Sequence, residues 1–413
     1  MLDRTARLAA LLFAALLGSS LAAERSTARD RVQAESDFPV ASDVRLGGDD
    51  KETRMVVDLS RRVDFRAFTL ANPYRVVIDM PQVSFQLGPK AGEAGRGLIK
   101  AFRFGLVMPG GSRMVIDLAH PARLDKAFVV DRANDQPARL VLDLAATDRE
   151  AFMRAISLES RPPETRPAPA HIEAKPAGDP RPLVMIDPGH GGIDNGTRSS
   201  SGELEKDIVL EFSLLLHDKI ERTGKYRVLM TRADDSFIPL GDRVTLARAQ
   251  QADLFISIHA DALRRKEGDA QGATVYTLSE RASDARAARL AEAENQADAI
   301  AGLDLSSEPR DVAGILIDLT RRETKTYSVK FAHAMVGELK KAARLHPGPI
   351  RSAAFVVLKA PDVPSVLLEL GYVTNKSDLQ SLISPEWRER TADSIVRAVN
   401  AFFGTRLAGG GRN

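Results

Sequence analysis

The chain has 413 residues, which is too long for one typical domain, so two domains are expected. Its hydrophobic content of 44%, charged content of 28% and formal net charge of +2 are ordinary for a globular protein and give no sign of nucleic-acid binding. The sequence has no cysteine, which excludes disulfide bonds, thiolate metal ligands and a cysteine nucleophile.

The N-terminus has the pattern of a secretory signal peptide. Arg4 and Arg7 precede an uncharged apolar run at 8–17, and 20–22 is a small-x-small cleavage site. We therefore expect residues 1–22 to be removed after export; an uncleaved anchor is the alternative. No adjacent arginine pair precedes the run, which favours Sec export over twin-arginine export. No later segment approaches the ~20 apolar residues of a membrane span, so no integral membrane segment is expected after cleavage.

Residues 40–147 read as β-strands and contain an internal repeat. The segment 54–59 recurs as 113–118, and 75–80 recurs as 139–144, each as arginine, three apolar residues, aspartate and one more apolar residue. Duplicated strands bounded by turns predict an all-β sandwich of two similar sheets. The repeated arginines and aspartates are explained either by strand-end solvation and cross-strand pairing or by a ligand-binding role.

The next segment, 148–182, begins with a possible short helix at 148–157 and then becomes rich in proline, which predicts an extended linker. From residue 183 to about 405, strand and helix patterns alternate. This alternation predicts an α/β domain with a largely parallel sheet covered by helices on both faces. The expected strands are 183–187, 226–231, 253–259, 274–278, 353–359 and 366–370, and the expected helices are 205–223, 240–250, 324–344 and 386–403.

Four short segments of this domain together indicate a zinc site. His190 lies just past one buried strand, His259 ends another, Glu205 opens a helix, and Glu369 lies in an apolar strand. Functional groups of such sheets gather at the carboxyl ends of the strands. Two imidazoles and a carboxylate would leave a fourth position on zinc for water, with a second carboxylate as the base. A single histidine at a strand end is more often a hydrogen-bonded structural residue than a metal ligand, so the prediction depends on the presence of all four segments together.

Glu369 also has a structural alternative, because a carboxylate among valine and leucine residues is sometimes only a paired buried group. Burial raises the pKa of a carboxylate toward the range useful for proton transfer, which favours a catalytic role.

With these motifs in order, residues 183–405 resemble the zinc-dependent N-acetylmuramoyl-L-alanine amidases of the type-3 family, the periplasmic enzymes of cell separation. The duplicated β region resembles the AMIN domain that targets such amidases to division-site peptidoglycan. The resemblance implies one zinc ion held by His190, Glu205 and His259, with Glu369 as the catalytic base. It implies hydrolysis of the amide between the lactyl group of N-acetylmuramic acid and L-alanine of the stem peptide. It also implies a periplasmic location, enriched at the division site.

Residues 279–323 form an insertion that a minimal amidase does not need. Its first part, 283–301, has helical spacing, and its later part, 312–319, is apolar. A solvated surface helix is one interpretation. The resemblance implies another, in which the insertion covers the active site until a periplasmic activator displaces it, with Glu294 or Glu292 on the open zinc position. Glu294 is preferred, and the apolar part is a candidate surface for the activator.

Two other functions compete with a zinc amidase. A wall-binding division factor that has lost activity is disfavoured because all four key residues are present. A zinc peptidase or carbohydrate deacetylase is compatible with the metal residues, and only the resemblance of the whole domain argues against it.

Overall fold

The computed structural model describes residues 38–158, 179–262, 271–303 and 315–409, apart from the single positions 89, 109 and 135. The expected signal peptide, most of the proline-rich segment and residues 312–314 lie outside these ranges. Within the described ranges, no helix is both long enough and apolar enough to cross a membrane.

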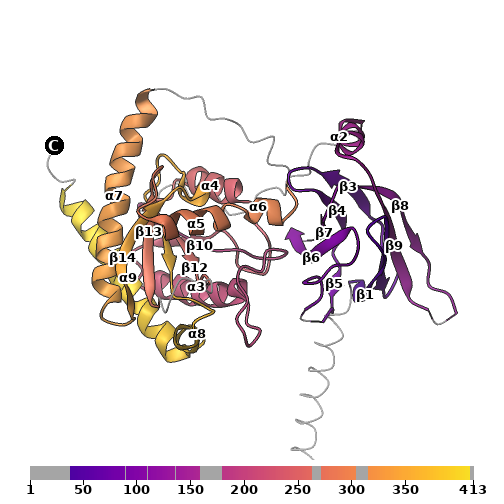
Figure 1. Ribbon diagram of the computed structural model, residues 1–413. Helices are drawn as coiled ribbons and strands as arrows, with labels where there is room; N and C mark the ends of the chain where they lie inside the picture. The colour runs from indigo at the N-terminus through magenta and orange to yellow at the C-terminus, as the bar shows by residue number, and fades with distance from the viewer. Residues whose placement is uncertain are drawn as a thin grey trace, which may run out of the picture.

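The N-terminal region is a sandwich of two sheets, seen edge-on at the right of Figure 1. One sheet has the order β5 (Ser84–Phe85), β1 (Val40–Gly48), β2 (Glu52–Leu59), β9 (Ala138–Ala146) and β8 (Ala122–Val130). The other has the order β3 (Arg66–Leu70), β4 (Arg75–Pro81), β7 (Gly111–Leu118) and β6 (Ile99–Met108). A short helix, α2 (Arg149–Leu158), follows the last strand. The expected sandwich of two sheets is therefore confirmed.

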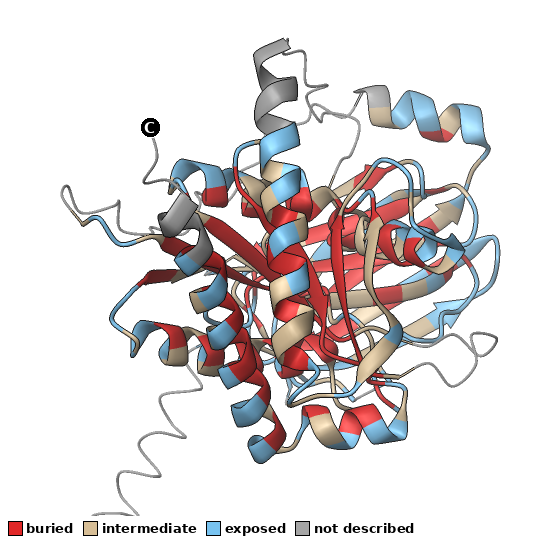
Figure 2. Ribbon diagram, turned by 90° about the vertical axis from the view of Figure 1, so that its left-hand side faces the viewer, coloured by how far each residue is buried: buried red, intermediate tan, exposed pale blue. Residues whose placement is uncertain are grey.

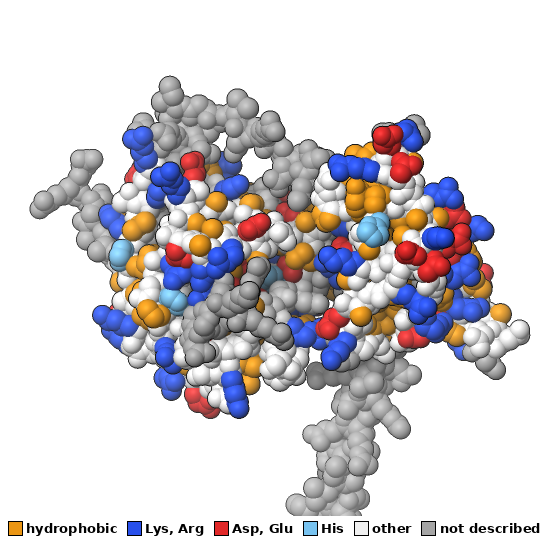
Figure 3. Space-filling view, viewed as in Figure 1, with side chains coloured by type: hydrophobic (Ala, Val, Ile, Leu, Met, Phe, Trp, Pro, Cys, Tyr) orange, Lys and Arg blue, Asp and Glu red, His pale blue; other side chains and the backbone are white. Residues whose placement is uncertain are grey.

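The sequence repeat is a structural repeat. Each sheet has one strand of each kind at its centre, β2 beside β9 in one and β7 beside β4 in the other. Antiparallel registers set Arg54 opposite Asp143 and Arg113 opposite Asp79, with ion pairs of 2.6 and 2.5 Å. The repeated charges thus form cross-strand pairs on the outer faces. Acidic and basic side chains are interspersed over the face of this region shown in Figure 3.

The C-terminal region is built on a six-stranded sheet with the order β11 (Arg227–Met230), β10 (Leu183–Pro188), β12 (Leu254–His259), β15 (Ser365–Glu369), β13 (Ala273–Leu278) and β14 (Leu345–Ala353). All neighbours are parallel except β13 and β15, which are antiparallel. The central strands are buried on both faces, which explains their continuous apolar runs. Figure 2 shows this buried sheet between its covering helices.

Helices cover both faces of the sheet, as the sequence predicts. One face packs on α3 (Glu205–Glu221), α7 (Ile315–Leu339) and α9 (Pro385–Gly409). The other packs on α4 (Leu240–Ala249), the 3-10 turn η2 (Val356–Leu358) and α5 (Ala285–Glu294). Two further short helices, α6 (Ala297–Ile300) and α8 (Lys376–Leu382), complete the described elements of this region.

One predicted strand is wrong. Within the segment 353–359, residues Val356–Leu358 form the turn η2, and the strand lies earlier, at β14, which ends at Ala353. Its sequence includes Pro347, Gly348 and Pro349, which suggest a break. Because β14 is at the edge of the sheet and shifts register against β13, it accommodates residues that cannot serve in a central strand.

The insertion supplies two short helices in place of the single predicted one. Asp284 caps the first turn of α5 by accepting the backbone N–H groups of Arg286 and Ala287. The chain then turns at Asn295 and Gln296 before α6 begins. Figure 1 shows α6 between the six-stranded sheet and strands β3, β4 and β7 of the sandwich.

Candidate metal centre

The loop that follows β10 brings His190 into the interior through an unusual backbone. His190 itself has a φ of 58°, a left-handed conformation that few non-glycine residues adopt. Gly189 lies so close to the second histidine that a Cβ there would stand 2.4 Å from Cε1 of His259. Glycine is therefore required at this position for the two imidazoles to approach one another.

Three side chains from different elements converge beside this loop. His190 follows β10, Glu205 is the first residue of α3, and His259 is the last residue of β12. Glu205 Oε1 lies 3.1 Å from His190 Nε2 and 3.6 Å from His259 Nδ1, and all three residues are buried. One ligand atom from each lies within 4.8 Å of the others, so the group is able to hold a metal ion.

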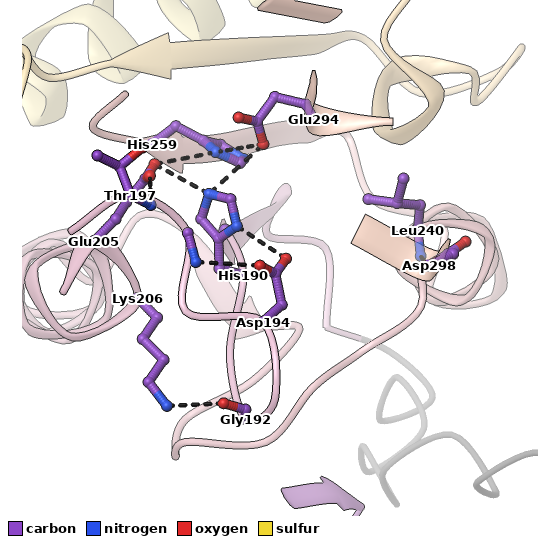
Figure 4. Close-up of polar contacts among 12 residues, drawn as sticks. His190, Gly192, Asp194, Thr197, Glu205, Lys206, Leu240, His259, Glu294 and Asp298 are labelled. Carbon is purple, nitrogen blue, oxygen red and sulfur yellow. Dashed lines mark hydrogen bonds and ion pairs between the residues drawn. The ribbon is translucent and has the colours of Figure 1, made fainter. Parts of the chain in front are cut away.

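A fourth donor atom comes from the insertion. Glu294, at the end of α5, places Oε2 at 3.6 Å from His190 Nε2 and 3.2 Å from His259 Nδ1 (Figure 4). In a tetrahedral zinc site with bonds of about 2.0–2.1 Å, neighbouring ligand atoms lie about 3.3–3.4 Å apart. The separations of 3.1 to 3.6 Å around both histidines match this spacing.

The donor set fits zinc chemically as well as geometrically. Nε2 of His190 and Nδ1 of His259 are buried yet make no well-aligned hydrogen bond to any described residue, although carboxylate oxygens surround them. Satisfied polar histidines would align their N–H groups with an acceptor. Two imidazole nitrogens with carboxylate oxygens are ordinary zinc ligands.

Asp194 supports His190 from behind. Its Oδ2 lies 2.9 Å from His190 Nδ1, and its Oδ1 accepts the N–H of Gly196 at 3.1 Å. This contact leaves Nε2 as the nitrogen that faces the other ligands, an arrangement typical of metal-binding histidines. The sequence analysis missed Asp194, although an acidic residue four positions after a candidate ligand is a usable signal.

Two buried arginines hold the same loop by its carbonyl groups. Arg243 donates to the carbonyls of Pro188 and His190 at 2.8 and 2.7 Å, and it pairs with buried Asp187 at 2.9 Å. Arg232 donates to the carbonyls of Pro188 and Gly189 at 3.1 and 2.7 Å. The sequence analysis missed both, since an arginine within a helical or loop pattern usually marks a solvated surface.

Glu369 lies next to His259 because the parallel register of β12 and β15 sets the two residues opposite each other. Its Oε2 accepts the N–H of Asp261 at 2.9 Å, while its buried Oε1 has no hydrogen-bond partner within the described residues. Burial, reinforced by nearby carboxylates such as Asp261, raises the pKa of Glu369 well above its usual value despite the opposing charge of His259. A carboxyl group in this state is suited to accept and return a proton.

The histidines are strongly affected by the surrounding carboxylates. Burial disfavours a charge on His259, but Glu294 and Glu205 outweigh it and raise the pKa to about 10. The same competition, with Glu205 and Asp194 foremost, raises the pKa of His190 well above its usual value. In the absence of a metal, protons on the two rings balance the negative charge, so a cation at this position is electrostatically favoured.

Glu292, the other candidate from the insertion, lies elsewhere. It is exposed and lines a surface cavity of about 410 Å³, together with Glu280, Ala288 and Gln296. Two positions along α5 from Glu294, it falls on a different side of the helix.

Comparison with known proteins agrees with this architecture. A family model described as N-acetylmuramoyl-L-alanine amidase matches residues 184–401, and one described as AMIN domain matches residues 43–144. The chain is 35% identical to the N-acetylmuramoyl-L-alanine amidase AmiC of Escherichia coli O6:H1 over 87% of its own length and 88% of that protein. It is 34% identical to AmiC of Neisseria meningitidis serogroup B over 86% and 88% of the two chains.

Among solved structures, the amidase AmiC2 of Nostoc punctiforme is 25% identical to this chain. It covers 55% of this chain and 99% of its own, with a TM-score of 0.40.

Proposed function

Because the chain belongs to the N-acetylmuramoyl-L-alanine amidase family and also carries an AMIN domain, we propose that it is a zinc hydrolase of peptidoglycan. The bond cleaved is the amide that joins the lactyl group of N-acetylmuramic acid to L-alanine of the stem peptide. The observation that carries the proposal is the convergence of His190, Glu205 and His259 at tetrahedral ligand spacing, with Glu369 beside them.

Each residue has a distinct part in this chemistry. His190, Glu205 and His259 would hold one zinc ion, which when bound supplies Lewis-acid activation of the amide carbonyl and of the attacking water. Glu369 accepts the proton of that water and returns it to the leaving amine nitrogen of L-alanine. Asp194 keeps the imidazole of His190 in the required tautomer.

Regulation of the enzyme forms part of the proposal. Glu294 occupies the place beside both histidines that water and the substrate carbonyl need. With its carboxylate there, neither reactant reaches its position, so the described state is inactive. Activation then requires that α5 move, and we assign this displacement to a periplasmic activator protein of the division machinery.

The remaining parts of the chain fit export and wall binding. The N-terminal signal pattern supports passage to the periplasm after removal of residues 1–22, and the AMIN region at 40–147 supports binding to peptidoglycan at the division site. The proline-rich segment within 148–182 joins this region to the catalytic domain at 183–405, in which 279–323 is the regulatory insertion.

Mass analysis of digested sacculi tests the activity directly. We expect the Glu294→Ala protein to release intact stem peptides from purified peptidoglycan. Its matched control is Glu292→Ala, on the same helix. Shortened peptides would identify a peptidase, and loss of acetyl groups would identify a deacetylase. If neither the parent nor the Glu294→Ala protein releases products when zinc is bound and a purified activator is added, the chain is a wall-binding factor without activity.

A further inference from the structure

The outer face of the sheet β3-β4-β7-β6 is occupied by the regulatory insertion. Val77 and Val115 point away from the interior of the sandwich and belong to the same apolar cluster as Ala297 and Ala301 of the insertion. Gly302 follows α6 with a φ of 73°, and a Cβ there would stand 2.9 Å from Val115 and 3.0 Å from Val77. The end of α6 is thus in close contact with the two valines.

Two arginines of the repeated strands bind the carbonyl groups at this end of α6. Arg75, only 2% exposed, donates to the carbonyl of Ala299. Arg113 donates to the carbonyl of Ala301 at 3.0 Å and to that of Gly302 at 3.4 Å. Carbonyls at the carboxyl end of a helix have no partner within the helix, so guanidinium groups are suitable donors for them.

The internal repeat provides a comparison within the same molecule. Arg54 and Val56 of β2 occupy the positions that Arg113 and Val115 occupy in β7. The side chain of Arg54 is 59% exposed and pairs with Asp143, whereas that of Arg113 is 13% exposed and contacts the insertion as well as Asp79. The same surface therefore exists twice, and α6 covers one of the two.

The position of α6 constrains the carboxylate at the metal centre. Two residues separate Glu294 from Ala297, so the two ends lie within roughly 10–11 Å along the chain. The intervening Asn295 is held by the carbonyl of Ala354 at 2.9 Å and the N–H of Val356 at 2.8 Å. On its other side α6 is fixed by Asp298, which accepts the N–H of Leu240 at 2.9 Å. Movement of α5 away from the zinc ligands thus strains or breaks the contact with the sandwich.

We infer that the sheet β3-β4-β7-β6 is a binding site for the carboxyl end of α6, through which the N-terminal domain stabilises the closed position of Glu294. This function is additional to wall binding, and it rests on the proposed inhibition by Glu294. The partner of the sheet is a helix end of this chain, recognised by two guanidinium groups and two valines.

Hydrogen exchange in the full mature protein tests the inference without reference to activity. Arg113→Ala should speed exchange of peptides from residues 285–303 on the order of tenfold, because hydrogen bonds to a charged donor are lost. Arg54→Ala is the matched control and should leave this segment unchanged. Equal exchange of residues 285–303 in the two variants would overturn the inference.

A second variant approaches the contact from the other side. Gly302→Ala changes no residue of the sandwich but inserts a methyl group toward Val77 and Val115. It should therefore also speed hydrogen exchange of residues 285–303. This result does not depend on whether Arg113→Ala disturbs the sandwich. In the double variant the two effects should be less than additive, because both act on one contact. Full additivity would place the effect of Gly302→Ala outside the contact and would contradict the inference.

Basal hydrolysis of a soluble N-acetylmuramoyl-tripeptide separates this inference from the proposed inhibition, because wall binding does not enter. Glu294→Ala should raise the rate; if it does not, the inhibitory role of Glu294 is wrong, while exchange still reports on the contact. If Glu294→Ala raises the rate but Arg113→Ala does so no more than Arg54→Ala, the stabilising role of the N-terminal domain is refuted.

Discussion

Replacing Asp194 with asparagine perturbs the support of His190 without removing a metal ligand. The carboxylate has two acceptor oxygens, one 2.9 Å from His190 Nδ1 and one 3.1 Å from the N of Gly196. Asparagine has one oxygen, so either the imidazole or the backbone N–H must face an amide NH₂ group. Because both side chains are at most 8% exposed, solvent cannot replace the missing acceptor.

Loss of such a partner typically lowers metal affinity by about 10–100-fold, which corresponds to about 1.4–2.7 kcal/mol. We expect zinc affinity to fall within this range, measured by competition with a chromophoric chelator at fixed pH. Asp218→Asn is the control, because Asp218 lies 3.2 Å from the half-buried His217 and far along α3 from the proposed ligand Glu205. A zinc affinity of Asp194→Asn within twofold of the parent would show that the contact does not support the ligand.

Four further predictions concern the metal and the base. Glu369→Gln, introduced into the Glu294→Ala protein, should retain one zinc per chain but lose ~10²–10⁴-fold in turnover. Parallel loss of zinc would instead make Glu369 a ligand or a structural residue. His259→Ala should abolish zinc binding in metal analysis, and full activity of that metal-free variant would refute the assignment. Burial opposes the charge on His259, but Glu294 and Glu205 raise its pKa to about 10, so zinc uptake at pH 7.5 should release protons in an unbuffered titration. In the zinc-free protein, protonation of His259 stabilises the fold. This stabilisation is fully present below pH ~6.5, the pKa of histidine in the unfolded chain, and is lost as the pH rises toward 10. A melting temperature that does not fall between these two pH values would contradict the raised pKa.

The sequence predicted those parts of the fold and site that depend on local pattern. His190 follows one buried strand and His259 ends the neighbouring one. In a parallel sheet the carboxyl ends of neighbouring strands meet, so the convergence of the two histidines was predictable. The duplicated strands likewise predicted two similar sheets, because each copy buries one face and pairs its charges on the other.

Features that depend on long-range packing were not predictable in the same way. Arg243 lies in a helix, and only the fold shows that its guanidinium reaches the carbonyl of His190. Glu292 and Glu294 share one helix, and the choice between them depends on how α5 is rotated against the sheet. The strand β14 was missed because its prolines are tolerated only at the edge of a sheet. That β14 is an edge strand can be seen only in the assembled sheet.

The order of the strands has a consequence for how the enzyme matures. The strand β15 is the last described strand of this sheet in sequence, yet it lies between β12 and β13 and is the sole described link between the two halves of the sheet. It also carries Glu369, whereas His190, Glu205 and His259 all precede β13 in the chain. A chain that is truncated before β15, or that has not yet inserted it, therefore has a divided sheet and lacks the proposed base. The position of Glu369 opposite His259 is thus reached only when β15 has paired with β12.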